Sequence, residues 1–428
     1  MKKTRAMLFA ALLASFLSTS IVFAEPQTTP NGPWVQDEQN LSFSSLMTNE
    51  QLYKELQKIE HASKGKMKLE VAGKSNDGNP LYVAKFGDND PNKKRVLITS
   101  QIHGNEPLTT EAVVELMQKL STGDKEVGKI LDKVTVWFMP RINPDGAMNQ
   151  YEGKRYPTRY THQTWDPVSF GLPEGTKAPW YYNSEGSERA QNNNGRVIYG
   201  IPGFDQNRDY NPNLDFNIED FDSETIASFL NSRDNNSDVG GLFVTPEARA
   251  VTKVFKELRP DVYLDLHHRG FNRLSEEDNR SVSIQVAAVV ADPYTDPFTG
   301  KQYEVDADVL KLAKQVNAVG YQSLQRGSSS FGAIQKYPDV NLPGTALGTF
   351  ALNDTAIMLI EVKGQTQTLG QKQNGMLKQT VIVPVYEILK SLGDGSIENV
   401  DTKVYDDIPK SANSIRKPVH GYEEDDLF

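Results

Sequence analysis

The chain has 428 residues, of which 38% are hydrophobic and 24% charged, so it can bury a sizeable core and lacks the composition of a disordered chain. The net charge of −10 argues against a nucleic-acid-binding protein, which needs a basic surface. The chain contains no cysteine, which excludes disulfides, iron–sulfur clusters and thiol nucleophiles. A metal ion would have to be bound by carboxylates or by some of the 6 histidines.

The first 24 residues have the pattern of a secretory signal peptide. Three basic residues precede an apolar run over residues 6–23, and Ala24 provides the small residue that a signal peptidase reads. The alternative is a membrane anchor, for which the run is short. We therefore expect cleavage after Ala24, a secreted or extracytoplasmic bacterial protein, and no stable membrane anchor. Cleavage would change the net charge from −10 to −13.

Hydrophobic periodicity and turn residues predict helices that alternate with strands. This alternation indicates an α/β sheet with helices on both faces. In chain order we expect a linker over 25–44, a helix over 48–63, strands over 67–71 and 81–86 joined as a hairpin, a strand over 95–100, a helix over 108–120, a strand over 134–139, a helix over 246–258, a strand over 262–266, a helix over 305–325, a strand over 356–362 and a helix over 376–392.

Residues 147–203 differ from the rest of the chain, because they are rich in tyrosine, asparagine, glycine and proline and show little periodicity. Loops of this length are uncommon in compact domains unless they are functional or separately structured. We interpret them as a long insertion in one domain over residues 45–395. Residues 396–428 then form a C-terminal extension with an acidic tail, most simply a solvated end.

Candidate metal ligands follow two predicted strands. His103 and Glu106 lie between a strand and a helix, and His267 directly follows another strand. Open α/β sheets bind ligands at the carboxyl ends of strands, and two histidines with one glutamate can hold catalytic zinc. The alternatives are a helix-capping pair for the first two residues and a packed core histidine for the third. Only one of His267 and His268 can face a metal, because neighbours on a strand point to opposite faces.

Two further motifs carry polar side chains. Glu361 ends an apolar strand, where a buried carboxylate is unfavourable unless it is paired or used, for example as a general base. Its alternative role is an ion pair with Lys363 or with a nearby arginine. Asn207 and Arg208 offer donors for a carboxylate, and Asp205 could accept the ring N–H of a metal-bound histidine. The alternative for this second motif is ordinary surface-turn chemistry.

Together these motifs resemble the zinc carboxypeptidase family, the carboxypeptidase A/B-like metallopeptidases. The resemblance covers residues 45–390 and implies a single α/β domain with a twisted, mixed, mainly parallel central sheet flanked by helices. It also implies one zinc ion and a peptide substrate with a free C-terminal carboxylate. The motifs are, in order, His103-x-x-Glu106, Asn143-Pro144-Asp145-Gly146, Asp205-x-Asn207-Arg208, His267 at a strand end and Glu361 in a late strand.

The resemblance implies a role for each motif residue. His103, Glu106 and His267 would be the zinc ligands, and Glu361 the general base. Asn207 and Arg208 would bind the terminal carboxylate of the substrate. Asp205 would be the hydrogen-bond partner of a ligand histidine.

The sequence also departs from the family pattern. Asn105 stands where animal members carry an arginine, so one guanidinium is missing from the substrate funnel. The arginine that stabilises the oxyanion has no clear motif here, and we expect it to be Arg189, with Arg196 as the alternative. Phe350 lies nearest to the position of the family's mobile tyrosine, and Tyr337 is the alternative.

The main hypothesis is therefore an exported zinc-dependent metallocarboxypeptidase that removes C-terminal residues from peptides. One alternative is a zinc amidohydrolase that acts on acyl-amino acids or cell-wall peptides. The other is a carboxypeptidase-like binding protein without turnover.

Overall fold

The computed structural model describes residues 46–189, 197–232, 237–269, 274–275, 282–325, 332–363 and 370–411. The expected signal peptide, the linker and the acidic tail all lie outside these ranges. Among the helices of the described residues, none combines the length and the apolar character needed to span a bilayer.

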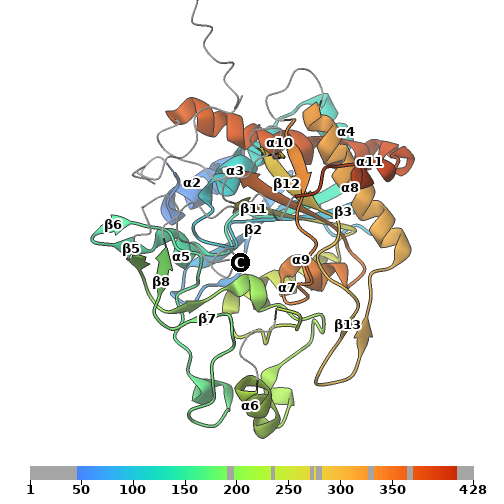
Figure 1. The fold of residues 1–428 in the computed structure, drawn as a ribbon. Coiled ribbons are helices and arrows are strands. Elements are labelled where there is room, and N and C mark those ends of the chain that lie inside the picture. Colours follow the sequence, from blue (N-terminus) through green and yellow to red (C-terminus); the bar gives the residue numbers. More distant parts are fainter. Residues whose placement is uncertain are drawn as a thin grey trace, which may run out of the picture.

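An eight-stranded mixed sheet forms the centre of the fold (Figure 1). Its four middle strands are parallel to one another, which confirms the expected mixed, mainly parallel α/β sheet. Antiparallel pairings join these middle strands to the strands on either side. The spatial order is β1 (Met67–Lys74), β2 (Pro80–Phe86), β4 (Val134–Met139), β3 (Lys94–Ser100), β11 (Val262–Arg269), β16 (Ala356–Lys363), β12 (Ile284–Ala287) and β15 (Ile334–Lys336).

Helices cover both faces of the sheet, and each face has its own hydrophobic cluster (Figure 1). Side chains such as Leu264 and Met358 belong to the cluster under the long helices, whereas Tyr263 and Ile357 belong to the other. The long-helix face carries α2 (Asn49–Ala62), α3 (Pro107–Ser121), α4 (Lys125–Leu131), α8 (Ala307–Gln325) and α10 (Gly370–Asp394); the second face carries α7 (Pro246–Leu258), α9 (Ala346–Ala351) and the long insertion.

Local sequence signals explain where several helices begin. Thr48 caps α2 in a capping box with Gln51, and Thr245 caps α7 ahead of a proline in the first turn. Several shorter elements were not predicted, among them α4, α6 (Ser223–Asn231), α9, β12 and β15. The first part of the C-terminal extension packs on the domain, because Ile397, Tyr405 and Ile408 belong to the same cluster as the long helices.

The insertion contains mainly short elements, as its composition predicts. Most of its strands are two or three residues long and pair locally. One of these pairs leads directly into the segment that begins with Asp205. The elements are β5 (Gln150–Tyr151), β6 (Lys154–Arg155), η1 (Pro167–Phe170), β7 (Tyr182–Asn183), β8 (Ser187–Arg189) and β9 (Val197–Tyr199), with β10 (Gly203–Phe204) at its end.

Glu247, in the first turn of α7, should make the stability of the protein depend on pH. Its side chain is fully buried, and burial, with smaller contributions from Asp145 and Asp209, raises its pKa to about 8 from 4.5. The folded state therefore favours the protonated form, so the contribution of Glu247 to stability is fully present below about pH 4.5 and is lost as the pH rises towards 8. Glu247→Gln should raise the free energy of unfolding at pH 8 by on the order of 2 kcal/mol, with the gain vanishing near pH 5.

Urea denaturation of both proteins at pH 5 and pH 8 measures this difference. Parallel pH profiles for the wild type and Glu247→Gln would contradict the assignment.

Candidate active site

Side-chain alternation along β11 and β16 determines which residues face the site. Tyr263 and Leu359 pack in the cluster of the second face, so residues an even number of positions away share that face. His267 and Glu361 meet this condition and are direct partners in the parallel register of the two strands. His268 lies on the opposite face of β11, as expected for the neighbour of a site residue.

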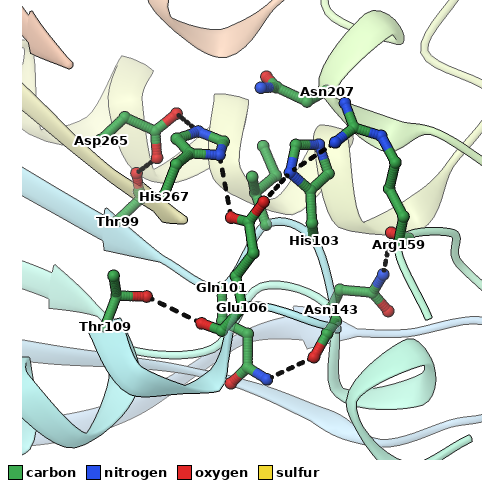
Figure 2. Close-up of polar contacts among 12 residues, drawn as sticks. Thr99, Gln101, His103, Glu106, Thr109, Asn143, Arg159, Asn207, Asp265 and His267 are labelled. Carbon is green, nitrogen blue, oxygen red and sulfur yellow. Dashed lines mark hydrogen bonds and ion pairs between the residues drawn. The ribbon is translucent and has the colours of Figure 1, made fainter. Parts of the chain in front are cut away.

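The three predicted ligands converge on one point (Figure 2). His103, Glu106 and His267 are buried, and one ligand atom from each lies within 4.8 Å of the others. Glu106 sits between the imidazoles, with Oε1 2.8 Å from Nδ1 of His103 and Oε2 3.1 Å from Nδ1 of His267. Burial alone would raise the pKa of Glu106, but the two histidines hold it below its usual range, so the carboxylate is charged.

This donor set fits a zinc ion. Two imidazole nitrogens and one carboxylate oxygen are the protein ligands of several catalytic zinc sites. Across the described ranges, no other group of three or more such side chains is equally close. Glu106 is also the residue before α3, but its side chain makes no capping hydrogen bond, so the helix-capping alternative does not explain it.

The loop that carries His103 and Glu106 is held in position by close backbone packing at Gly104. Between the two ligands of this loop, Gly104 packs against the backbone of Gly146, Ala147 and Thr158 so tightly that a Cβ would clash with all three. Only glycine permits this approach. The loop therefore rests directly on α5 (Pro144–Met148), which follows Asn143 in the second motif.

Asp205 contacts the other ring nitrogen of His103, as the sequence suggested. Its Oδ1 is 3.2 Å from Nε2 of His103. Its Oδ2 accepts a hydrogen bond from Arg159 Nε at 2.9 Å and lies 2.8 Å from Arg159 Nη2 in an ion pair. Burial alone would raise the pKa of Asp205, but Arg159, Arg208 and His103 hold it well below the usual value. The segment is thus a buried part of the site, which excludes the surface-turn alternative.

Arg159 is the site residue that the sequence analysis missed. Its Nη1 lies 3.2 Å from Nδ1 of His103, and its backbone carbonyl accepts a hydrogen bond from Asn143 Nδ2 at 3.1 Å (Figure 2). Burial alone would lower the pKa of Arg159, but Asp205 and Glu106 raise it above the usual value. The guanidinium is therefore a fixed positive charge beside the candidate metal ligands.

The sequence contained a weak signal for this arginine. Arg159 follows the Asn143-Pro144-Asp145-Gly146 motif within the same insertion as the expected Arg189, but nothing local distinguishes one arginine of the insertion from another. The backbone of Arg189 belongs to β8, and its side chain is outside the described part of the structure, as is Arg196.

Glu361 is a buried carboxylate with the properties of a general base. Its Oε2 is enclosed and has no hydrogen-bond partner within the described residues, and no ion pair there joins it to Lys363. Burial raises the pKa of Glu361 to about 7, with a further increase from Glu106 and opposing effects from His267 and Arg269. A carboxyl with this pKa can take up and release a proton near neutral pH.

Asn207 and Arg208 lie in η2 (Gln206–Arg208) next to the ligand cluster, and both are buried. The Asn207 side-chain oxygen accepts a hydrogen bond from the backbone N–H of Ala346 at 3.1 Å, and its carbonyl accepts one from Arg208 Nη1 at 2.8 Å. The following Asp209 accepts hydrogen bonds from Tyr181 of the insertion and from the α7 N-cap. The site segment is therefore anchored to both the insertion and the second face.

The structure separates the two candidates for the mobile tyrosine. Phe350 is a core residue, fully buried and stacked on Phe255 with ring centroids 3.8 Å apart. Tyr337 is close enough to the site for the charges of Glu361 and Arg208 to affect its pKa, which burial raises. Phe350 therefore belongs to the core, and Tyr337 is the candidate phenol that lies within electrostatic range of Glu361.

Comparison with known proteins agrees with this geometry. The model of a family described as zinc carboxypeptidase matches residues 52–275, slightly more than half of the chain. The chain belongs to the zinc carboxypeptidase family. The matched segment contains all three candidate ligands and ends before Glu361, whose assignment rests on the register of β16 with β11.

Curated members of the zinc carboxypeptidase family align over short segments. Carboxypeptidase E from Caenorhabditis elegans is 34% identical over 82 residues, which cover 17% of each chain. Zinc carboxypeptidase from Saccharothrix mutabilis subsp. capreolus is 31% identical over 87 residues, or 19% of this chain and 20% of that one. These alignments therefore span a fifth or less of the curated relatives.

Solved structures of carboxypeptidases share the fold over most of the chain. Thrombin activatable fibrinolysis inhibitor matches with a TM-score of 0.50 at 14% identity, covering 86% of this chain and 82% of that one. Carboxypeptidase A from Helicoverpa armigera matches with a TM-score of 0.50 at 16% identity, covering 90% of this chain and 81% of that one. At these identities the likeness establishes a common fold.

Proposed function

We propose that this member of the zinc carboxypeptidase family is an exported metallocarboxypeptidase that removes C-terminal residues from peptides. The observation that carries the proposal is the buried cluster of His103, Glu106 and His267 with Glu361 in register beside it on the adjacent strand. Export rests on the signal-peptide pattern of the first 24 residues.

One zinc ion would be held by His103, Glu106 and His267. When bound, it supplies a Lewis acid that polarises the scissile carbonyl and makes water more acidic. Glu361 takes the proton of the attacking water and delivers it to the leaving amine, a role that suits its pKa of about 7. These residues provide the general acid–base chemistry of peptide hydrolysis.

Two arginines interact with the negative charges of the substrate. Arg159 donates hydrogen bonds to the negative charge that develops on the carbonyl oxygen, and Asp205 keeps this guanidinium charged and in place. We assign to Arg159 the role that the resemblance suggested for Arg189. Arg208, with the Asn207 amide, binds the terminal carboxylate of the substrate. Tyr337 is the candidate for the mobile tyrosine, because it lies within electrostatic range of Glu361.

Zinc-loaded protein should release the C-terminal residue of a blocked dipeptide and act at least about tenfold more slowly on the corresponding C-terminal amide, because the amide offers no charge to Arg208. Arg208→Ala should lower kcat/KM for the acid by roughly 10–100-fold and abolish the preference for acid over amide. Assays of the two substrates with both proteins measure the effect.

Each alternative function has its own outcome in this assay. Equal rates on acid and amide would contradict the assignment of Arg208. Release of acetate or succinate from acyl-amino acids without peptide hydrolysis would identify an amidohydrolase. Stoichiometric zinc without hydrolysis of any peptide or amide would identify a binding protein.

A further inference from the structure

The second candidate metal-ligating histidine has a buried carboxylate of its own, which the sequence analysis did not assign. Nε2 of His267 lies 2.9 Å from Oδ2 of Asp265, two residues earlier on the same face of β11 (Figure 2). Asp265 is fully buried and His267 is 2% exposed. A hydrogen bond from Nε2–H to this carboxylate fixes the tautomer and leaves Nδ1, which faces Glu106, free to bind a metal.

Asp265 is itself held by a chain of hydroxyl groups across two strands. Its Oδ1 accepts a hydrogen bond from Thr99 Oγ1 at 2.7 Å, and the same oxygen of Thr99 is 2.7 Å from the Tyr263 hydroxyl. Since the single threonine proton goes to the carboxylate, Tyr263 donates to Thr99. Thr99 and Asp265 are direct partners in the parallel register of β3 and β11, so the backbone of the sheet holds these hydrogen-bonded side chains in place.

Asp265 and Asp205 differ in the groups that pair with their carboxylates. Asp205 is paired with Arg159, but the hydrogen-bond and ion-pair partners of Asp265 in the described part of the chain are Thr99 and His267, with no lysine or arginine among them. A buried carboxylate is destabilising unless it is paired. The imidazole of His267 is the partner of Asp265 that can carry a positive charge, and it must be neutral to bind a metal. A divalent ion bound at His267 would balance the charges of both Asp265 and Glu106.

We propose that Asp265 is a positioning residue that orients His267 and tightens zinc binding. This inference rests on the zinc site of the proposed function. It extends that site from the three ligands into the sheet through Thr99 and Tyr263.

Zinc affinity tests the inference directly, by competition with a chromophoric chelator. Asp265→Asn should weaken zinc binding by about 10–100-fold, because Asn is a poorer acceptor and carries no charge. The increase in Tm on adding zinc should therefore be smaller than in the wild type. A merely structural aspartate would lower Tm in both states and leave zinc affinity unchanged.

Two further variants complete the design. Thr99→Val removes the hydrogen bond to Asp265 at nearly constant volume and should weaken zinc binding several-fold. Asp296→Asn is the matched control, because Asp296 is equally buried but accepts hydrogen bonds from Phe298 and Thr299 in its own turn. Its zinc affinity should equal that of the wild type.

Zinc binding by Asp265→Asn within about twofold of the wild type would overturn the inference and leave the proposed function standing. If Asp265→Asn does not fold, unchanged affinity in Thr99→Val would overturn it, and a several-fold loss would support it. A wild-type chain that binds no zinc would overturn the proposed metal site, and this inference with it.

Discussion

Replacing Glu361 by glutamine should lower kcat by about 10²–10⁴-fold while zinc remains bound. Glutamine keeps the shape of the side chain but cannot accept a proton. Glu361 is the carboxylate in register beside His267, and among the described residues its enclosed oxygen has no hydrogen-bond partner, so the variant loses the base without breaking a hydrogen bond. KM should change much less than kcat, since Glu361 acts on the proton of the attacking water.

Glu247→Gln is the matched control for this experiment, because it makes the same change at another fully buried glutamate outside the site. It should leave kcat unchanged at neutral pH. Steady-state kinetics and zinc content, measured on both variants and the wild type, separate loss of the base from loss of metal. If Glu361→Gln keeps more than about a tenth of the wild-type kcat, Glu361 is not the base.

Replacing Arg159 by alanine should lower kcat by about 10²–10³-fold, the range for loss of one donor to a developing oxyanion. Arg159 is the described arginine that lies within 3.2 Å of a candidate metal ligand. Arg159→Lys should restore little activity, because a single ammonium group cannot reproduce both the hydrogen bond and the ion pair with Asp205.

The control is Arg249→Ala, which removes an exposed arginine whose guanidinium bonds to the carbonyl of Val244. Its kcat should match the wild type. If Arg189 stabilises the oxyanion instead, Arg189→Ala would be the severe variant and Arg159→Ala the mild one. That result in steady-state assays would contradict the role given to Arg159.

Long, strongly patterned elements could be predicted from the sequence. The helix expected over 246–258 matches α7, which has buried side chains at helical spacing, and the strand expected over 134–139 matches β4, a continuous run of buried residues. Elements such as β15 could not be predicted in this way. It has three residues and includes the polar Gln335, so neighbouring strands rather than its own sequence determine its conformation.

The candidate ligands could be proposed from the sequence because each one directly follows a recognisable strand. Arg159 and Asp265 show where this approach ends. Arg159 lies in an insertion without periodicity, and its contact with His103 joins residues 56 positions apart. Asp265 appeared in the sequence as one more residue of an apolar strand, and its role became visible only from its distance to His267.

The sequence by itself determined the family pattern, the α/β class and the types of side chain available for a metal in a chain without cysteine. Tertiary structure alone showed that Arg159 contacts His103, that Phe350 packs in the core, and that each candidate histidine has its own carboxylate. The physical reason is that local patterns fix the face on which a side chain lies. Strand register and the close packing of the His103 loop on α5 fix which side chains meet.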